Sequence, residues 1–401
     1  MSTRGLSKAR LGRMSDVVRG YVDRGETAGI VALAARGSDV HVEVAGLQDV
    51  ETRVPMLQDT IFRIASMTKP VTAVAAMMLV EETKLKLDAP VDKWLPELAD
   101  RKVLRSIESP LSDTVPANRA ITLRDLLTLR NGVGAVMAQP DQYPIQKAID
   151  DAGVAPGPLP SPLSTEQWMS NLSALPLIHQ PGERWMYHIG SDILGVLVSR
   201  AAGVSLGTFF RERIFEPLGM VDTGFSVPAS KIDRLATSYR RDAESGKLLV
   251  FDPARDGKWS QAPSFEHGGG GLVSTVDDFL AFGRMLVNGG RHGSVRLLAR
   301  PTVEVMMTDQ ITPEQKAVSP FFPGFWETTG WGLGAGVTTR RDGVGPAVGS
   351  CGWTGGLGTA WCSDPAEDMV TIFLNQRMMM GPGDLDINED VFTLAYAAIE
   401  D

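Results

Sequence analysis

A serine and a lysine three residues apart, Ser66 and Lys69, stand just before the longest apolar stretch of the chain. On a helix, residues at this spacing lie side by side, and polar groups on an inward face need partners or a chemical role. A helix N-terminus favours a developing negative charge, and a partly buried lysine can lose its proton near neutral pH. The pair could therefore form an activated nucleophile without histidine. Because Ser-x-x-Lys alone is a weak pattern, the simpler alternative is a helix start in which Ser66 caps and Lys69 is solvated.

Two later segments contain residue types that suit the same chemistry. Tyr187 lies in "PGERWMYHIGSDILG", just before an apolar helix that we expect from about Gly190. Trp353 lies in "GSCGWTGGLGTAWCSDP", and glycines in an expected strand often mark a close approach to the backbone. Taken alone, Tyr187 would more simply be a core aromatic residue with a satisfied hydroxyl, and the glycine-rich strand a β-bulge.

Two short motifs offer a rival interpretation. The segment Gly203–Gly207 matches the Gly-x-Ser-x-Gly turn of α/β-hydrolases and would make Ser205 the nucleophile. That turn must follow a buried strand, whereas the preceding residues have a helical pattern that ends at Gly203, so we expect Ser205 to cap the next helix. His267 and its four glycines match the lipase oxyanion motif, but in lipases that motif precedes the nucleophile and here it follows Ser205. We expect the glycine run to shape a loop beneath the site.

The elements that position these residues are strands at both ends of the chain and helices in the middle. The segment between Pro140 and Pro162 is rich in proline, which argues against a packed element there. Ser274 or Thr275 is expected to cap a helix after the glycine run. Strands at both ends favour one mixed sheet closed by the terminal segments, beside an inserted all-α region. The expected elements are a helix at about 8–24, strands at 29–37 and 40–49, a helix at 71–83, strands at 331–340, 345–356 and 358–376, and a closing helix from about 388.

Composition excludes several classes of function. The chain of 401 residues is 43% apolar and 22% charged, which is typical of a globular protein. Its net charge of −9, without a dense Lys/Arg stripe, disfavours nucleic acid and anionic membranes as partners. An apolar stretch of about ten residues is too short to span a bilayer. No apolar region follows the charged N-terminus, so we expect no secretion signal.

Cysteine and histidine usage predicts a cytoplasmic protein without a metal or other cofactor. The two cysteines, Cys351 and Cys362, fit a reducing cytoplasm and give no disulfide framework, and we expect both to be small buried side chains. The histidines show no metal-ligand spacing, so no metal site is expected. They are His41, His179, His188, His267 and His292.

Five segments occur in the order expected for one known superfamily. They are "IFRIASMTKPVTAVAAMMLVEETKLKLDAPVDKWLPEL", "ITLRDLLT", "PGERWMYHIGSDILG", "GGGGLVSTVDDFLAF" and "WTGGLGTAWCSDP". With them the chain resembles the serine β-lactamase and penicillin-binding protein superfamily, and within it class C β-lactamases and the related family VIII carboxylesterases. The resemblance implies an α+β fold, with a mixed antiparallel sheet built from N- and C-terminal segments, flanked by helices, and an inserted mainly α-helical region. It also implies a single catalytic domain over residues 1–401, with an α/β part at about 1–85 and 265–401 and a helical part at about 86–264.

The resemblance also implies a role for each residue of the site. Ser66 would be the acylated nucleophile, Lys69 its proton partner, and Tyr187 the shared base and leaving-group acid. The oxyanion hole would be formed by the backbone N–H groups of Ser66 and Gly356. Which of Lys69 and Tyr187 is the true base stays open, and we expect the charge on Lys69 to lower the pKa of Tyr187.

Two departures from the lactamase pattern bear on the substrate. Where lactamases follow the tyrosine with x-Asn, this chain has His188-Ile189, and where they carry Lys-Thr-Gly it has Trp353-Thr354-Gly355. The missing asparagine and lysine help to bind the amide and carboxylate of an anionic β-lactam, and a buried anion needs such donors. A tryptophan suits an uncharged, fairly apolar acyl or alkoxy group, and the Trp-x-Gly form resembles the esterase branch of the superfamily.

We therefore expect a serine carboxylesterase that cleaves small neutral esters through an acyl-enzyme on Ser66, with weak β-lactam turnover as a side activity. The same machinery could instead serve a β-lactamase, a D-amino-acid peptidase or amidase, or an acyltransferase to an alcohol. Outside enzymes, the alternative is an inactive binding or sensor module. The full set of Ser66, Lys69 and Tyr187 argues against that alternative, because a protein without catalysis has no physical reason to hold all three.

Overall fold

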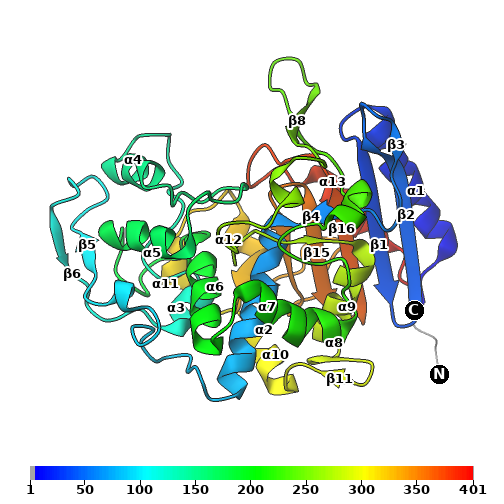
Figure 1. The fold of residues 1–401 in the computed structure, drawn as a ribbon. Helices are drawn as coiled ribbons and strands as arrows, with labels where there is room; N and C mark the ends of the chain where they lie inside the picture. The colour runs from blue at the N-terminus through cyan, green and yellow to red at the C-terminus, as the bar shows by residue number, and fades with distance from the viewer. Residues whose placement is uncertain (1–4, 401) are drawn as a thin grey trace.

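The computed structural model describes residues 5–400, and its centre is an eight-stranded antiparallel sheet with helices on both faces (Figure 1). The N- and C-terminal segments join where β1 pairs with β16, from Ile30 opposite Asn375 to Arg36 opposite Met369. This arrangement confirms the predicted α+β fold. From one edge to the other, the strands are β12 (Thr329–Trp331), β13 (Gly336–Thr338), β14 (Cys351–Gly355), β15 (Thr359–Asp364), β16 (Met369–Asn375), β1 (Gly29–Arg36), β2 (Asp39–Asp49) and β3 (Val54–Pro55).

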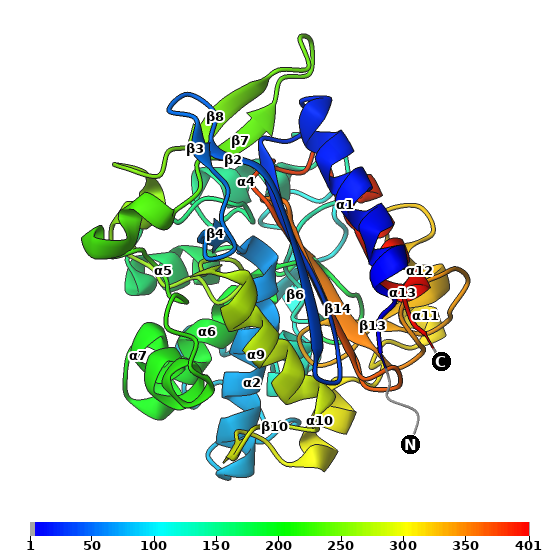
Figure 2. The same cartoon turned by 90° about the vertical axis from the view of Figure 1, so that its right-hand side faces the viewer.

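The strand β1 shows how the sheet is buried on both sides. All of its residues are buried, and up to Ala35 its sequence is a continuous apolar run rather than an alternating one. Ile30 and Ala32 face one hydrophobic cluster, whereas Val31 and Leu33 face another, as the two-residue period of a strand requires. The covering helices are α1 (Lys8–Asp23) and α13 (Asp386–Ala397) on one face, with α2 (Thr68–Glu81) and α9 (Val276–Val287) on the other (Figure 2).

The middle of the chain is mainly helical and lies beside the sheet (Figure 1). Two short hairpins accompany its helices. They are β5 (Lys102–Leu104) with β6 (Thr114–Pro116), and β7 (Ser238–Arg241) with β8 (Leu248–Asp252). The α-helices are α3 (Leu123–Leu127), α4 (Pro144–Asp151), α5 (Thr165–Ala174), α6 (Ile189–Ala202), α7 (Leu206–Phe210) and α8 (Glu216–Leu218). Short segments of other helix types are η2 (Pro96–Leu98), η3 (Arg211–Phe215), η4 (Ala229–Arg234) and η5 (Lys258–Ser260).

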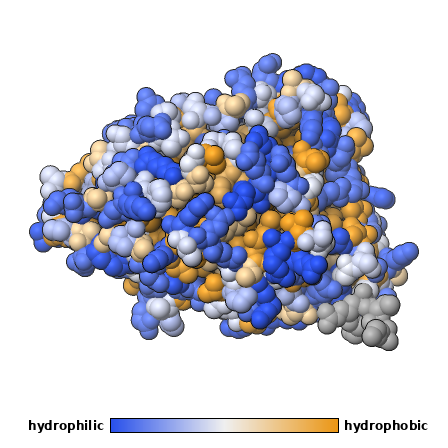
Figure 3. All heavy atoms as spheres, turned by 60° about the horizontal axis from the view of Figure 1, so that its bottom comes forward, coloured by the Kyte–Doolittle hydropathy of each residue, from blue (hydrophilic) through white to orange (hydrophobic). Residues whose placement is uncertain are grey.

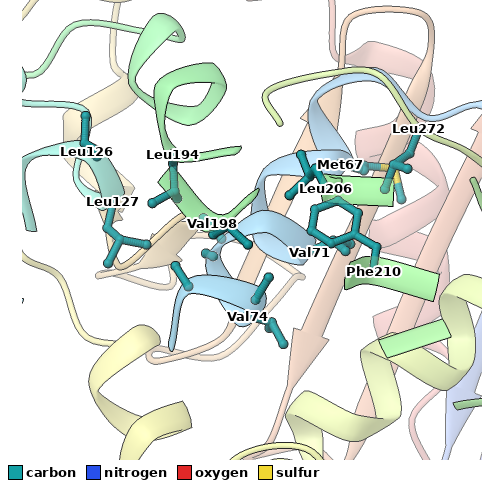
Figure 4. Close-up of a cluster of buried hydrophobic side chains, with 14 of the residues drawn as sticks. Met67, Val71, Val74, Leu126, Leu127, Leu194, Val198, Leu206, Phe210 and Leu272 are labelled. Carbon is teal, nitrogen blue, oxygen red and sulfur yellow. The ribbon is translucent and has the colours of Figure 1, made fainter. Parts of the chain in front are cut away.

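The helix α2 joins the helical region to the sheet. Nearly all of its residues are buried, and the core around it includes Val71 and Val74 together with Val198 of α6 and Phe210 of α7 (Figure 4). Apolar burial of this extent holds the first turn of α2 in one place, and that turn carries Lys69.

The C-terminal half adds short elements around the sheet edge. The expected strand at 331–340 is two strands, β12 and β13, separated by a turn at Gly334, whose φ of 95° suits glycine. The closing helix begins at Asp386, two residues before its expected start. The remaining elements are β4 (Phe62–Arg63), η1 (Ala65–Met67), β9 (Val273–Ser274), β10 (Arg291–His292), β11 (Val295–Arg296), α10 (Arg300–Met306), α11 (Pro313–Ala317) and α12 (Phe325–Thr328).

The expectation of no packed element between Pro140 and Pro162 is wrong for its first half. The helix α4 lies there and buries Ile145 and Ile149. Pro144 occupies its first turn, where the missing N–H of proline costs nothing, so a proline marked a helix start and not a loop. The later prolines of the stretch do lie outside helices and strands. The division into an α/β part and a helical part stays a prediction, and residues 1–4 and 401 lie outside the described residues.

The surface mixes polar and apolar side chains. Hydrophilic residues cover much of the face shown in Figure 3, with hydrophobic patches between them. Within residues 5–400, no single helix is long and apolar enough to cross a membrane. One bent pair, α6 with the segment Leu206–Leu218, passes that test by length and composition only, and the residues of α6 are mostly buried in the core.

Candidate active site

Ser66 lies in the single turn η1, directly before α2. Its side chain makes no capping hydrogen bond, because Met67 is the N-cap residue of α2. Ala65, the preceding residue, has a φ of 43°, a strained value for an L-residue of the kind that clusters at active sites. The simpler alternative, a capping serine beside a solvated lysine, is wrong, because Lys69 is 1% exposed.

Three short contacts surround the amine of Lys69. Its Nζ atom lies 3.0 Å from Ser66 Oγ, 3.1 Å from His188 Nδ1 and 2.6 Å from the carbonyl oxygen of Gly269. Burial lowers the pKa of Lys69 to about 7, although the charge of Asp192 opposes the shift. At neutral pH a large fraction of Lys69 is therefore the neutral amine, beside the hydroxyl of Ser66.

Tyr187 lies just before α6, on the other side of Ser66 from the polar neighbours of Lys69. The Nζ atom of Lys69 lies 4.4 Å from the centre of its ring, and the indole N–H of Trp353 donates to its hydroxyl oxygen at 2.8 Å. Burial raises the pKa of Tyr187 well above its ordinary value, although hydrogen bonds with Ser66 and Trp353 oppose the shift. The expectation that Lys69 lowers the pKa of Tyr187 is therefore wrong, because desolvation of the phenolate outweighs the other causes.

Gly356 follows the end of β14 and lines the same cavity as Ser66. The strand end packs closely on the residues before Ser66, since a Cβ atom on Gly355 would lie 2.3 Å from the carbonyl oxygen of Ile64. The hydroxyl of Thr359 donates to that same oxygen at 3.1 Å. The backbone of Gly356 is thus brought beside Ser66, whereas its role in an oxyanion hole stays a prediction.

A cavity of about 460 Å³ opens over Ser66. Its wall beside Tyr187 is aromatic: the ring of Phe321 lies 5.2 Å from that of Tyr187 and 6.2 Å from that of Trp353. Trp331 supports Trp353 from behind at 4.6 Å. Among the described residues that line the cavity there is no lysine, arginine, aspartate or glutamate. The cavity can therefore hold an uncharged, largely apolar group.

A polar chain that was not predicted from the sequence lies behind Lys69. His188 Nε2 lies 3.1 Å from Asp192 Oδ2, and the backbone N–H of Gly269 donates to Asp192 Oδ1 at 2.8 Å. His267 Nδ1 lies 3.4 Å from the same Oδ1 atom. The sequence carried a weak signal for this chain in the spacing of His188 and Asp192, four residues apart across the start of the predicted helix. In the part of the chain that the structure describes, no group of three or more such side chains is arranged to hold a metal ion.

The glycine run that follows His267 lies beneath the site, as expected. Leu272, directly after the run, accepts the backbone N–H of Ile64 at 3.0 Å, and β4 pairs with β9 next to it. The loop is packed tightly, because a Cβ atom on Gly269 would lie 2.8 Å from Asp192 Oδ1. The close packing explains why glycine occupies this position and how its carbonyl reaches Lys69.

The rival nucleophile Ser205 is a helix cap. Gly203 ends α6 in the left-handed conformation, with a φ of 75°, and Ser205 Oγ then accepts the backbone N–H of Thr208 at 3.1 Å. The segment before Ser205 is a helix and not a strand, so it lacks the geometry of an α/β-hydrolase turn.

Comparison with known proteins agrees with this geometry. A family model described as Beta-lactamase matches residues 14–393. Protein Rv1367c of Mycobacterium tuberculosis (strain ATCC 25618 / H37Rv) is 41% identical over 368 residues, which cover 90% of this chain and 88% of that protein. Esterase EstB of Burkholderia gladioli is 29% identical over 389 residues, covering 91% and 90%.

A solved structure is similar along the whole chain. EstCE1, described as a hydrolase with promiscuous acyltransferase activity, matches with a TM-score of 0.80 and 26% identity over 97% of this chain and 99% of that chain. Similarity to an esterase and to this hydrolase indicates an enzyme that hydrolyses or transfers acyl groups. Because the family model spans nearly the whole sequence, the chain belongs to the beta-lactamase family, within the serine β-lactamase and penicillin-binding protein superfamily.

Proposed function

We propose that the protein is a serine carboxylesterase that hydrolyses neutral esters through an acyl-enzyme on Ser66. The observation that carries the proposal is the buried amine of Lys69, 3.0 Å from Ser66 Oγ with a pKa lowered to about 7, below a cavity lined without charged side chains in the described residues. We place it with the family VIII carboxylesterases, acting on a small-molecule ester in the cytoplasm.

The first half of the reaction forms the acyl-enzyme. Neutral Lys69 accepts the proton of Ser66 as Oγ attacks the ester carbonyl, and the backbone N–H groups of Ser66 and Gly356 stabilise the oxyanion. Tyr187 is the general acid, because its raised pKa keeps it protonated beside Ser66 and Trp353 donates to its oxygen, so its own O–H can donate to the leaving group. The alkoxide leaves with that proton, and the ammonium of Lys69 returns a proton to Tyr187.

The second half uses the same groups in reverse. A water molecule attacks the acyl carbon, and the Tyr187–Lys69 pair takes its proton. Collapse of the intermediate breaks the bond to Ser66 Oγ, which regains a proton. The products are a carboxylic acid, an alcohol and the unchanged enzyme.

The cavity supports a neutral substrate over an anionic β-lactam. The one N–H of the Trp353 indole donates to Tyr187. The indole therefore offers a substrate apolar area but no free hydrogen-bond donor. A carboxylate placed against Phe321 and Trp353 would lose its hydration without gaining a cation. Hydrolysis of β-lactams or D-amino-acid peptides is therefore at most a side activity in this account.

Transfer of the acyl group to an alcohol is a second candidate. The description of EstCE1 as a hydrolase with promiscuous acyltransferase activity favours it, since an alcohol in place of water would complete the same second half. The apolar cavity over Ser66 would retain such an acceptor.

A substrate panel tests the proposal. Short p-nitrophenyl esters, nitrocefin and D-alanyl peptides are compared as substrates, with the esters measured again in the presence of a primary alcohol. We expect kcat/KM for the esters to be at least about 10²-fold higher than kcat/KM for nitrocefin. Turnover of nitrocefin as fast as p-nitrophenyl butyrate would overturn the substrate assignment. Ester product accumulating faster than acid would favour the transferase.

A further inference from the structure

The geometry around Lys69 constrains how its amine can act as a base. A neutral amine has two N–H donors and one lone pair, and Lys69 Nζ has three polar neighbours: Ser66 Oγ, His188 Nδ1 and the carbonyl of Gly269. The lone pair reaches Ser66 only if both N–H bonds are held by the other two neighbours. Gly269 can only accept, so the histidine decides the outcome.

His188 exists in two neutral forms with opposite consequences. If Nδ1 carries the proton, it donates to Lys69 and occupies the lone pair that Ser66 requires. If Nε2 carries the proton, Nδ1 accepts an N–H from Lys69 at 3.1 Å, and the lone pair is left for Ser66. The tautomer of one buried imidazole therefore selects between a competent and a blocked base.

Asp192 selects the competent tautomer. Its Oδ2 atom is 3.1 Å from His188 Nε2, and a carboxylate can only accept, so the proton of His188 belongs on Nε2. The other oxygen accepts the N–H of Gly269, and it faces Nδ1 of His267. Since His267 Nε2 accepts the backbone N–H of Ser161 at 2.9 Å, the proton of His267 lies on Nδ1 and points at Asp192. Three donors thus converge on one carboxylate that is 2% exposed.

We propose that His188 and Asp192 are positioning residues that aim the lone pair of Lys69 at Ser66, an inference that rests on the proposed function. Asp192 holds the Nε2–H tautomer of His188, and His188 Nδ1 then holds one N–H of Lys69. When the proton passes from Ser66 Oγ to Lys69 Nζ, the O–H bond breaks and a third N–H bond forms. The ammonium finds the same three neighbours as acceptors, so no group has to turn during the step.

Burial and charge agree with this assignment. Burial and the charge of Lys69 lower the pKa of His188, which keeps the imidazole neutral. Despite burial, the adjacent imidazoles of His188 and His267 hold the pKa of Asp192 far below its usual range, which keeps the carboxylate an acceptor. The titratable groups that face this pair are Lys69 on α2, Tyr187 before α6 and His267 on the glycine loop.

Asp192→Asn is the decisive variant, because an amide N–H facing Nε2 would move the proton of His188 to Nδ1. We measure the rate constant for labelling of Ser66 by a fluorophosphonate between about pH 5 and about pH 9, and kcat/KM for p-nitrophenyl butyrate over the same range. At high pH, the plateau of the labelling rate constant and of kcat/KM should fall by a factor on the order of 10² or more. This is the scale on which a wrong tautomer disables a base. The acid limb should move to lower pH, because the removed charge had raised the pKa of Lys69.

A purely electrostatic or structural role gives a different result. In that case the acid limb or the melting temperature changes while the plateau stays within about twofold of wild type, and that outcome overturns the inference. Asp278→Asn is the matched control. Asp278 is a buried carboxylate on α9, outside the site, that accepts from Asp222 and Thr223, and its variant should keep the wild-type plateau.

A second pair of variants decides the question if Asp192→Asn does not fold. His188→Asn and His188→Leu have nearly the same shape, but only asparagine can present an acceptor to Lys69. The asparagine variant should label Ser66 at least about tenfold faster than the leucine variant at equal thermal stability. Equal rates would overturn the inference. If wild-type protein labels at Ser66 but hydrolyses no ester, the proposed function fails, and the same labelling rates still decide the roles of His188 and Asp192.

Discussion

The two sides of the site are built in opposite ways. On the side of Lys69, every contact is directional, and the three polar atoms around Nζ lie between 2.6 and 3.1 Å away. On the side of Trp353, apart from its hydrogen bond to Tyr187, the contacts are between ring faces and edges, such as 4.6 Å to Trp331 and 6.2 Å to Phe321. Tyr187 belongs to both sides, because its hydroxyl is hydrogen-bonded with Ser66 and its ring joins the aromatic wall.

The difference explains which property each side controls. Hydrogen bonds depend steeply on angle and distance, so we expect the polar side to set the rate of the proposed proton transfer. Dispersion and apolar burial depend on area and tolerate changes of shape, so the aromatic side sets which substrate is held. Substitutions on the polar side should therefore change rates by orders of magnitude, and those on the aromatic side should change selectivity in smaller steps.

The largest effect is expected at the nucleophile. Ser66→Ala should abolish ester hydrolysis and leave the fold intact, because the change removes one hydroxyl that caps no helix. Ser205→Ala should cost about 1 kcal/mol of stability through loss of a helix cap and leave kcat near wild type. Steady-state kinetics with p-nitrophenyl butyrate and thermal unfolding check both. An active Ser66→Ala protein beside an inactive Ser205→Ala protein would reverse the assignment.

The proton relay should show the next largest effect. Lys69→Ala and Tyr187→Phe should each lower kcat by at least about 10², the usual scale for acid–base groups. In the double variant, kcat should fall by a much smaller factor than the product of the two single-variant factors, because the residues act as a unit. Full additivity in single-turnover kinetics would show two independent roles and contradict the relay.

A smaller effect is expected at Trp353, where the two sides meet. Trp353→Lys should lower kcat/KM for a neutral ester by roughly ten- to a hundredfold, because the new cation must be desolvated against an apolar group. It should reduce the ratio of kcat/KM for the ester to kcat/KM for a cephalosporin, mainly because kcat/KM for the ester falls. Trp353→Phe is the control, since it keeps a ring but removes the N–H that Tyr187 accepts.

The two variants of Trp353 separate the effect of an added positive charge from the effect of keeping an aromatic ring. Trp353→Phe should keep the preference for neutral esters with a loss of about tenfold or less, the order expected for one hydrogen bond. If Trp353→Lys instead became an efficient cephalosporinase without further changes, the aromatic wall would not be what excludes the anion. Ile189 makes that outcome unexpected, because it lacks the amide that would hold a lactam side chain.

The last prediction concerns the pH dependence of the wild-type protein. Because Lys69 must be neutral to accept a proton and its pKa is about 7, kcat/KM should rise with pH up to about neutrality and then level off. Below that point it should fall about tenfold per pH unit, as for a single protonated base. A pH–rate profile with p-nitrophenyl butyrate measures this limb. A limb that begins only near the ordinary pKa of lysine would contradict a desolvated amine.

The sheet and the first half of the site could be predicted from the sequence because their signals are local. The apolar run of β1, the spacing of Ser66 and Lys69, and the helix end at Gly203 each lie within a few residues. The helix cap at Thr275, one of two residues expected there, could be predicted because its signal is also local.

The rest of the site depends on contacts between distant segments. His188 meets Lys69 across 119 positions and Gly269 meets it across 200, and neither residue type suggests a role without the fold. The aromatic wall brings Phe321 to Tyr187 in the same way. The pKa of Tyr187 was misjudged for a related reason, since a nearby charge can be guessed from sequence but the degree of burial cannot.

The proposed function depends on Ser66 as the nucleophile, activated by a neutral Lys69. Peptide mass spectrometry after reaction with a fluorophosphonate tests it most directly, because it reports where the covalent bond forms without assuming a natural substrate. We expect one adduct, on Ser66, that forms faster as the pH rises through about 7 and is lost in Ser66→Ala. An adduct on Ser205, or no adduct at any pH, would contradict it.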